Sequence, residues 1–414
     1  MDNGDYPQNK LEPVRNTAPL DGRCVLIVVE NLPVPFDRRV WMEARTLKAA
    51  GAAVSVICPT GAGYEARFEQ IEGIDIYRHP LPADATGALG YFLEYSLAIF
   101  WELILAVRVL KRQGIDIIHG CNPPDLIFLV ALVLRPFGVR YIFDHHDINP
   151  ELYEAKFRKR GILWRAMKLF ELLTFKSAAV SIATNESYRK IAIERGGMEP
   201  QNVFVVRSGP DLNRLHSVNP NPQWRNGRSY LVGYVGVMGQ QEGIELLLDS
   251  IKHLVFVRGR TDVQFVLVGD GPAFTDLNSL ATKLGVAEYV TFTGRVPDNQ
   301  LFEVLSTADI CVNPDRVNPM NDKSTMNKIL EYMAFAKPIV QFDVTEGRYS
   351  AAGSSFYARP NDIVHFAELV EQLLDDPVRR TEMGREGRSR IEELFSWPHQ
   401  EPHLIAAYRR ALEL

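Results

Sequence analysis

The chain has 414 residues, of which 46% are hydrophobic and 23% are charged, and its formal net charge is −5. This length predicts two domains, because a single domain usually holds about 100–200 residues. The apolar content is typical of a globular soluble protein, and the negative charge argues against nucleic acid as the main partner.

Cysteine usage and the N-terminal segment point to the cytoplasm. Cys24, Cys58, Cys121 and Cys311 are scattered without a CxxC pair, so we expect neither a zinc site nor disulfides, but four buried thiols. Residues 1–20 are polar and lack the apolar segment of a signal peptide, so we expect a disordered tail. No run reaches the roughly 18 apolar residues of a membrane helix.

The first half of the chain alternates strands and helices. A buried-strand pattern at 24–29 is followed by a helical stretch at 39–50 and a second strand at 53–57, which is the unit of a parallel sheet. Further strands are predicted at 74–77, 115–119, 141–144, 180–183 and 203–206. We therefore expect residues 21–207 to form one α/β domain.

Residues 208–229 are rich in proline and asparagine and are predicted to be a linker. A second alternating set follows, with strands at 231–235, 264–268, 290–293, 310–312 and 338–342 and helices at 244–254, 274–284, 299–306 and 324–335. The predicted fold is α/β, with two Rossmann-like doubly wound parallel-sheet domains facing across a cleft. The second spans residues 230–394 and precedes a C-terminal helix at 395–414.

Glycine-rich turns follow two strands of the second half. Residues 233–239 contain three glycines, and residues 267–272 contain two. Glycine lets a backbone approach a ligand closely, and the next helix presents free N–H groups that suit a phosphate. A tight strand–helix turn is an equal alternative for 233–239, and a helix cap is the favoured role for Asp270.

A polar loop with lysines leads into a helix that we expect to begin near Ser324. Ser324 and Thr325 are good N-terminal residues whose amides can bind phosphate oxygens, and Lys323 and Lys328 add positive charge. Glu331 lies one turn later, where its carboxylate can accept both hydroxyls of a ribose. The alternative for Glu331 is an ion pair with Lys328 three residues before it.

Polar residues also follow strands in the first half. The segment 144–151, DHHDINPE, contains two histidines and three carboxylates. Neighbouring side chains point in different directions, so a sugar-binding loop is favoured over a metal site or a purely structural role. The polar strand ends at 30–39 and 119–125 are equally compatible with a place in the cleft and with ordinary loops.

A basic segment at 156–160 precedes a helix at 163–175 that carries aromatic and leucine side chains. Basic residues beside exposed aromatics can dock on an anionic membrane surface. The alternative is a core helix with a solvated basic edge, and the sequence leaves both open. Contact with the cytoplasmic face of the membrane is therefore one of two expectations.

Several of these segments together resemble the retaining glycosyltransferases of family four, which have the GT-B fold. They are 236–243, 268–272 (VGDGP), 292–295 (FTGR), 327–334 (NKILEYMA), Pro35-x-Asp37-x-Arg39 and Asp144-x-His146-Asp147 with Pro150-Glu151. The resemblance covers residues 22–412, and its motifs are specific only as a set.

The resemblance implies that the second domain binds a nucleotide diphosphate sugar without a metal or other cofactor. It also implies transfer that retains the anomeric configuration. The apolar and basic segments of the first half suggest an acceptor that is a lipid-linked, polysaccharide or glycoconjugate precursor. Glu331 would hold the ribose, Arg295 would lie near the base, and His146 would touch the donor sugar or reaction centre. The diphosphate would lie at Gly236, Met238, Gly239, Ser324, Thr325, Asn327 and Lys328. The tail after Trp397 would cross back to the first domain.

Two departures from the family pattern concern charge. The family has two glutamates with seven residues between them, and the first position here is Lys323. An arginine and a lysine are usual in the first loop of the second domain, where this chain has Val237 and Glu242. Our hypothesis is that Lys323 and Lys328 supply the missing positive charge, with Lys323 joining His146 and Glu331 in the reaction.

Two other functions fit the same architecture. One is a sugar-nucleotide epimerase, and the other is a catalytically decayed scaffold that binds a nucleotide sugar. A dehydrogenase is disfavoured, because no GxGxxG turn opens either half.

Overall fold

The computed structural model describes residues 18–80 and 87–414, and its first domain contains one sheet of eight strands. The strand order is β3-β4-β2-β1-β5-β6-β7-β8, and every pairing is parallel except that of β3 with β4. The strands are β1 (Cys24–Val29), β2 (Ala53–Pro59), β3 (Phe68–Ile71), β4 (Ile74–His79), β5 (Ile117–Cys121), β6 (Arg140–His145), β7 (Val180–Ala183) and β8 (Val203–Val205).

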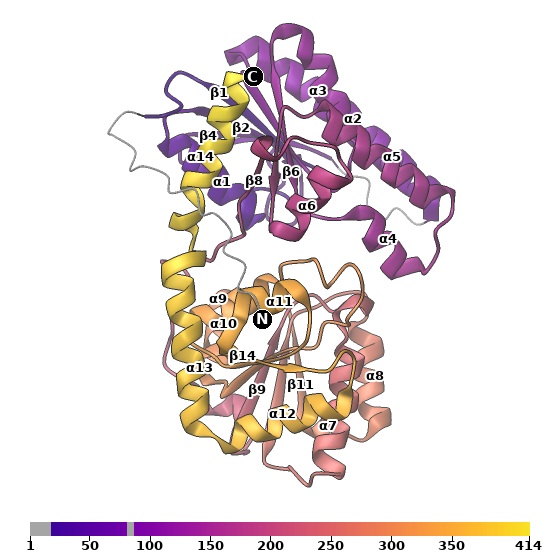
Figure 1. Ribbon diagram of the computed structural model, residues 1–414, viewed down its shortest axis with the longest axis vertical. Coiled ribbons are helices and arrows are strands. Elements are labelled where there is room, and N and C mark those ends of the chain that lie inside the picture. The colour runs from indigo at the N-terminus through magenta and orange to yellow at the C-terminus, as the bar shows by residue number, and fades with distance from the viewer. Residues whose placement is uncertain (1–17, 81–86) are drawn as a thin grey trace.

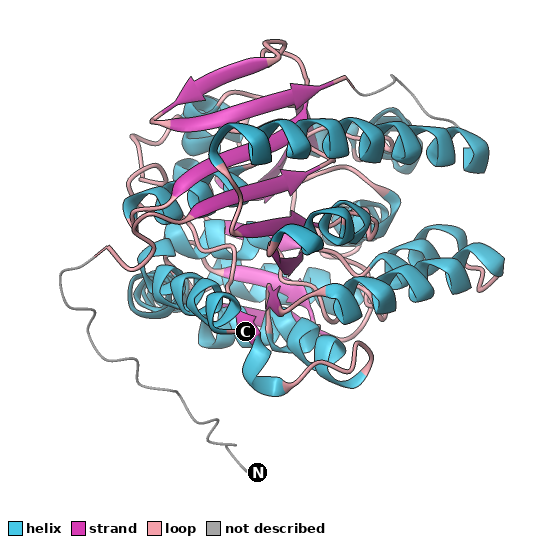
Figure 2. Cartoon of the chain, turned by 90° about the horizontal axis from the view of Figure 1, so that it is seen from above, coloured by secondary structure: helices cyan, strands magenta, loops and turns pink. Residues whose placement is uncertain are grey.

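Helices cover both faces of this sheet (Figure 2). They are α1 (Arg38–Ala49), α2 (Gly87–Gln113), α3 (Phe128–Leu134), α4 (Asn149–Phe157), α5 (Ile162–Ser177), α6 (Glu186–Glu194) and the last helix of the chain, α14 (Trp397–Glu413). Alternate residues of a strand point to opposite faces. Ile27 of β1 accordingly packs with α1 and α14, whereas Val28 packs with α2, α3, α5 and α6.

The second domain has a six-stranded sheet that is wholly parallel, in the order β11-β10-β9-β12-β13-β14. Its strands are β9 (Tyr230–Val235), β10 (Val263–Val268), β11 (Val290–Gly294), β12 (Ile310–Asn313), β13 (Ile339–Phe342) and β14 (Ser355–Ala358). Its helices are α7 (Ile244–Phe256), α8 (Phe274–Leu284), α9 (Asp298–Thr307), α10 (Asn327–Ala334), α11 (Thr345–Ala351), α12 (Ile363–Asp375) and α13 (Pro377–Arg390). The first domain lies above the second in Figure 1.

The predicted fold class is confirmed: two doubly wound parallel-sheet domains follow one another along the chain. Strands β3 and β14 were not anticipated, because both are short and β3 has no buried residue. Residues 1–17 of the expected tail lie outside the described residues. Within the described part of the chain, no helix combines the length and apolar character needed to cross a bilayer.

The C-terminal helices connect the two domains. Helix α13 packs on the second domain, a π-helical turn at Ile391–Phe395 follows it, and α14 then packs on the first domain (Figure 1). Trp397 and Leu404 of α14 are buried in the same core as β1 and α1. The first domain therefore includes the last helix of the chain in its core.

We expect Leu404→Ala to lower the free energy of unfolding of the first domain by about 2–5 kcal/mol, because it removes a fully buried side chain and leaves a cavity. Arg409→Ala is the control on the same helix. Its side chain is exposed, so its effect should stay within about 0.5 kcal/mol. Urea denaturation followed by circular dichroism measures both, and equal effects would contradict the packing of α14 described here.

Candidate active site

Charged and polar side chains from the carboxyl ends of both sheets meet between the domains. Arg38, at the start of α1, lies 3.1 Å from Asp298 and 3.9 Å from Glu331 of the second domain. Asn185, just after β7, donates a hydrogen bond to the carbonyl oxygen of Lys323 at 2.8 Å. Ligands of open parallel sheets bind outside the carboxyl ends of the strands, so this region is the candidate site.

His146 follows β6 on the first-domain side of this region. Its backbone N–H donates to Oδ1 of Asn122 at 2.7 Å, and its Nε2 lies 2.5 Å from Oδ2 of Asp144 and 2.9 Å from Nε of Arg39. Burial opposes ionisation of Asp144, but the Arg39 guanidinium and His146 hold its pKa well below the ordinary value. An ionised carboxylate thus orients the imidazole, of which 15% is exposed.

Four potential metal ligands lie behind His146. The side chains of Glu43, His119, Cys121 and Asp144 are all buried, and their ligand atoms lie within 4.8 Å of one another. Nη2 of Arg39, however, lies 3.1 Å from Glu43 and 2.9 Å from Asp144, so a protein cation already compensates these carboxylates. Burial also raises the pKa of the Cys121 thiol, whereas a metal needs a thiolate. We interpret the cluster as an ion-pair network.

Glu331 lies on α10 and faces the first domain. Its carboxylate is 21% exposed, and its ion-pair partner Arg38 is 3.9 Å away, too far for a hydrogen bond. Burial raises the pKa of Glu331, and the charges of Arg38 and Arg214 oppose that shift. The carboxylate oxygens therefore retain capacity to accept hydrogen bonds from a ligand between the domains.

The helix predicted to begin near Ser324 begins at Asn327 instead. The Ser324 hydroxyl donates to the carbonyl oxygen of Met320 at 2.9 Å, which closes a turn rather than capping the helix. The Thr325 hydroxyl accepts a hydrogen bond from Asn185 at 3.0 Å. These side chains join the two domains, and a phosphate at this helix start would have to bind backbone amides.

Lys328 does not have the free charge that the sequence suggested. Its Nζ lies 2.7 Å from Glu242 and 2.8 Å from Asp315, and only 9% of its side chain is exposed. One ammonium faces two carboxylates, and burial raises the pKa of Asp315 to about 7. The charge of Lys328 is therefore already balanced by these two carboxylates, and the hypothesis that Lys328 replaces the basic clamp requires it to exchange them for the diphosphate.

Lys323 remains available to an anionic ligand. Its side chain is 37% exposed, and its Nζ lies 4.0 Å from Glu151 of the first domain, beyond hydrogen-bond distance. The position is at the domain interface, since the carbonyl oxygen of the same residue accepts from Asn185. Of the two lysines singled out by the sequence, only Lys323 has a loosely held charge.

The glycine turn after β9 packs closely on the next strand. The Gly236 amide donates to the carbonyl oxygen of Val268, and the Met238 amide donates to that of Asp270, both at 3.0 Å. Met238 is buried in the core of the second domain, so its side chain is unavailable to a ligand. A Cβ on Gly236 would lie 2.8 Å from Oη of Tyr234 and 3.3 Å from Cε of Lys328, so a larger residue here would require these side chains to move.

Further polar residues at strand ends were missed by the sequence reasoning. Arg207, two residues after β8, stacks 4.5 Å from the ring of Tyr349 and lies 3.6 Å from Glu346 in the second domain. Single residues such as Arg207 form no motif, and their position just after a strand is the signal that could have found them.

Arg295 was predicted to lie near the base of the nucleotide. In the structure its guanidinium stacks 4.5 Å from the ring of Phe36 in the first domain.

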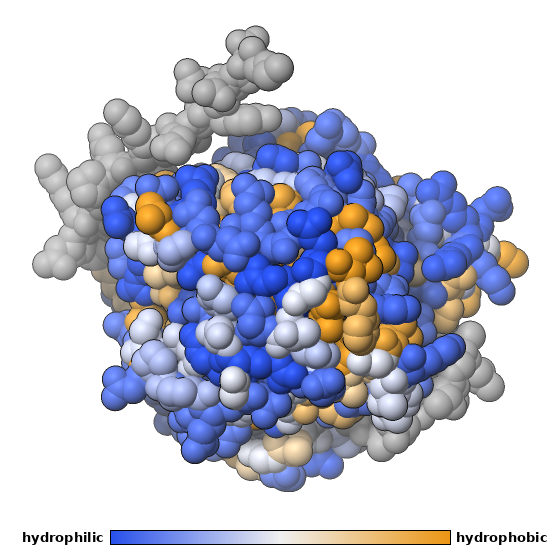
Figure 3. Space-filling view, turned by 90° about the horizontal axis from the view of Figure 1, so that it is seen from below, coloured by the Kyte–Doolittle hydropathy of each residue, from blue (hydrophilic) through white to orange (hydrophobic). Residues whose placement is uncertain are grey.

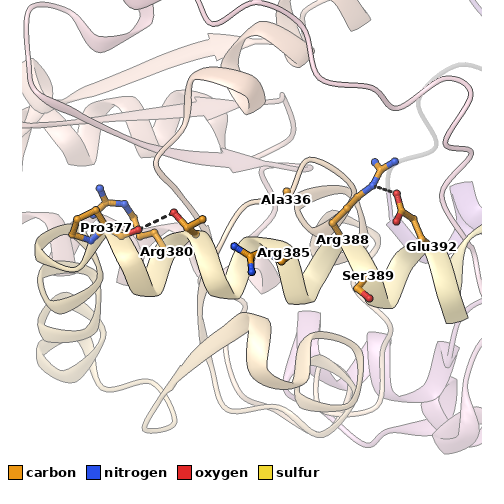
Figure 4. A pocket seen from close by; sticks show the side chains of 8 residues that line it. Ala336, Pro377, Arg380, Arg385, Arg388, Ser389 and Glu392 are labelled. Carbon is orange, nitrogen blue, oxygen red and sulfur yellow. Dashed lines mark hydrogen bonds and ion pairs between the residues drawn. The ribbon is translucent and has the colours of Figure 1, made fainter.

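A surface cavity of about 600 Å³ lies elsewhere, along α13 (Figure 4). It is lined by Ala336, Pro377, Arg380, Thr381, Arg385, Arg388, Ser389 and Glu392. Arg380 donates to carbonyl oxygens at the end of α12, and Arg388 pairs with Glu392 at 2.6 Å. These arginines support the helix packing, and the cavity includes none of the candidate site residues.

Comparisons with known proteins agree with this geometry. Residues 37–209 match the family described as "Glycosyl transferase 4-like domain", and residues 229–376 match "Glycosyl transferases group 1". The alpha-D-kanosaminyltransferase of Streptomyces kanamyceticus is 30% identical over 326 residues, which cover 74% of this chain and 80% of that protein.

Two solved structures share the fold over nearly the whole chain. Sucrose-phosphate synthase from Thermosynechococcus elongatus aligns with a TM-score of 0.77 at 18% identity and covers 94% of this chain and 98% of its own. HepE from Anabaena, in complex with UDP-glucose, aligns with a TM-score of 0.69 at 15% identity and covers 92% and 98%. The GT-B arrangement implied by the resemblance is confirmed.

We expect Lys328→Met to lower the free energy of unfolding by about 3–5 kcal/mol near pH 8, because Glu242 and Asp315 lose their buried counter-charge. The loss should shrink near pH 5. Acids with raised pKa values bind more protons in the folded state than in the unfolded state, so stability falls as pH rises.

Urea denaturation at the two pH values tests this expectation. Lys283→Met, at an exposed position of α8, serves as the control and should change the free energy by less than about 0.5 kcal/mol at either pH. A loss for Lys328→Met that is small, or equal at both pH values, would show that the carboxylates do not depend on this lysine.

Proposed function

The chain belongs to the group 1 glycosyltransferases and is a nucleotide-sugar-dependent glycosyltransferase, and from this premise we propose which residues bind its donor and acceptor. The donor is a nucleoside diphosphate sugar held by the second domain, and Glu331 binds the ribose. The observation that carries this proposal is the Glu331 carboxylate, which faces the first domain with its nearest cation 3.9 Å away. HepE, a structure of the same fold, contains UDP-glucose.

The diphosphate lies between the glycine turn after β9 and the start of α10. Backbone N–H groups at a helix start favour an anion. Lys323 contributes the mobile positive charge, because Lys328 is balanced by two carboxylates. Only residues of this chain are assigned to the diphosphate, and no metal is required.

His146 stands on the acceptor side of the reaction. In the proposed transfer, the bond between the anomeric carbon and the phosphate oxygen breaks, and a bond to the acceptor oxygen forms on the same face of the sugar. The acceptor proton passes to an oxygen of the departing diphosphate. His146, oriented by Asp144, contacts the donor sugar, so that this chain mainly positions the reactants and stabilises the leaving charge.

Glu331→Ala and Lys323→Ala test the donor site. A panel of nucleotide sugars identifies the donor by thermal stabilisation of the wild type, and titration calorimetry then measures its affinity. Each variant should lose about tenfold or more in affinity, because hydrogen bonds to charged groups contribute about 1.5–3 kcal/mol. Lys283→Ala is the matched exposed control, and unchanged binding by Glu331→Ala would contradict the proposal.

The acceptor is a lipid-linked glycan precursor at the cytoplasmic face of a membrane. Support comes from a surface formed by α2, α3, α5 and the turns beside them, which we call the apolar face. Of the 24 large hydrophobic side chains that are exposed in the described part of the chain, 14 lie between residues 97 and 173. Helix α3 packs against both α2 and α5, so the helices that carry most of these side chains lie together on one side of the first domain (Figure 1).

Charge beside the apolar face fits an anionic lipid surface. Residues 156–177 contain seven lysines and arginines and one acidic residue, so their net charge is +6 (7 − 1), in a chain whose net charge is −5. The acidic residue, Glu171, is buried and paired with Arg195. Basic residues next to exposed apolar side chains are the combination that holds a protein on anionic lipids.

The surface of the second domain differs from the apolar face of the first domain. Seen from below, the second domain presents a largely hydrophilic surface with hydrophobic side chains over only part of it (Figure 3). Phe256 and Val257, at the end of α7, are also exposed, but the arginines beside them, Arg258 and Arg260, are paired with acidic residues. They provide matched controls for the apolar face.

Co-sedimentation with vesicles tests the membrane contact. The wild type should bind vesicles that contain phosphatidylglycerol more tightly than vesicles of pure phosphatidylcholine. It should dissociate from the former as the salt concentration is raised. Phe137→Ser combined with Ile162→Ser should weaken binding by about tenfold or more, because a buried large apolar side chain contributes about 1.5–3 kcal/mol. Phe256→Ser combined with Val257→Ser should leave binding unchanged, and equal binding by all variants would contradict the proposal.

A further inference from the structure

A buried chain of hydrogen bonds connects the last helix of the protein to His146. Oη of Tyr408 on α14 lies 2.6 Å from Nδ1 of His119, whose Nε2 lies 3.2 Å from Oδ2 of Asp144. The same Oδ2 lies 2.5 Å from Nε2 of His146. Tyr408, His119 and Asp144 are fully buried, so no solvent competes for these bonds.

The proton positions in this chain follow from its chemistry. Asp144 is ionised and can only accept, so His119 donates to it from Nε2. Burial lowers the pKa of His119, which leaves the imidazole neutral and its Nδ1 free to accept. Burial likewise raises the pKa of Tyr408, so its hydroxyl keeps its proton and donates to Nδ1. Asp144 thereby fixes the Nε2–H tautomer of His119, and the Tyr408 hydroxyl hydrogen-bonds the free Nδ1 and holds the ring toward Asp144.

The orientation of the His119 ring matters for His146 because the two histidines share one carboxylate oxygen. A hydrogen bond from His119 disperses negative charge on Asp144 and holds the carboxylate in place against Arg39. The charged and titratable groups that face this pair are Arg39 and Glu43 of α1, His119 and Cys121 of β5, and Tyr408 of α14.

We propose that Tyr408 is a positioning residue for glycosyl transfer, acting through His119 and Asp144 on His146. The proposal rests on the role of His146 proposed above. Helix α14 follows the second domain in the chain but packs on the first (Figure 1), so the acceptor-side site is complete only when this helix is docked.

Docking of α14 and the action of the Tyr408 hydroxyl can be separated experimentally. Trp397 donates from its indole to the Thr46 hydroxyl at 2.9 Å, and Arg410 donates to Asn202 at 2.8 Å. Neither bond reaches Asp144. Trp397→Phe is therefore a matched control that removes a docking hydrogen bond of α14 and leaves the chain to His146 intact.

The first experiment needs no substrate. Nitrogen-15 NMR of histidine-labelled protein reports the tautomer of each of the nine histidines, and His119→Gln identifies the resonance of His119. We expect His119 in the Nε2–H form in the wild type, in Trp397→Phe and in Tyr408→Phe, because Asp144 fixes that tautomer. The Nδ1 resonance of His119 should move in Tyr408→Phe, where this nitrogen loses its hydrogen bond, but not in Trp397→Phe. An Nδ1 resonance that Tyr408→Phe leaves unchanged would overturn the proposal.

The second experiment measures hydrolysis of the nucleotide sugar that stabilises the wild type most. Tyr408→Phe should lower kcat by about 10-fold to 100-fold and leave the donor KM within about twofold. Trp397→Phe should leave both unchanged per folded molecule. An unchanged kcat for Tyr408→Phe would overturn the proposal.

Two further variants distinguish the proposal from its premise. His119→Gln, whose amide can donate to Asp144 and accept from Tyr408, should keep more activity than His119→Ala, and Tyr408→Phe should cost nothing more in the His119→Ala background. If the losses of activity in the two single variants multiply in the double variant, Tyr408 does not act through His119. If His146→Ala keeps full activity, the role proposed for His146 fails, and the proposal for Tyr408 fails with it.

Discussion

The direction of the strands is the constraint on which the rest of the structure depends. Apart from β3 with β4, every strand pair is parallel, so the loops that leave the carboxyl ends of each sheet gather on one edge. The chain connects the two sheets so that these edges meet, as Arg38 with Glu331 and Asn185 with Lys323 demonstrate. Polar groups of the two domains thereby pair with one another between the domains, where a donor and an acceptor can approach each other.

Buried charge is organised differently on the two sides of this interface. In the first domain, Arg39 compensates the ionised Asp144, which orients His146, whereas burial raises the pKa of the neighbouring Glu43. In the second domain, Lys328 is enclosed by Glu242 and Asp315, which leaves little net positive charge beside the glycine turn. The first arrangement fixes a reactive side chain in one orientation. The second balances the charge of a lysine that lies beside the proposed donor site.

The sequence was sufficient for the parts of the molecule that depend on local pattern. Alternation of apolar strands and helices predicted both sheets, and the motif around Glu331 predicted the helix that carries it. The start of that helix was misplaced, because Ser324 has the chemistry of a helix cap but its hydroxyl bonds to Met320 in the preceding turn. The partners of Lys328 were out of reach, since Glu242 lies 86 residues away in the chain. Tyr408 belongs to no motif at all, and only the docking of α14 brings it to His119.

The most direct measurement is a crystal structure of the protein with the nucleotide sugar that stabilises it. The ribose hydroxyls are expected within about 3 Å of the Glu331 carboxylate, with the diphosphate at the start of α10 and the sugar turned toward His146. A nucleotide bound elsewhere, for example in the arginine-lined cavity along α13, would contradict the assignment of the site. So would a complex in which Glu331 remains beside Arg38 and touches no part of the ligand.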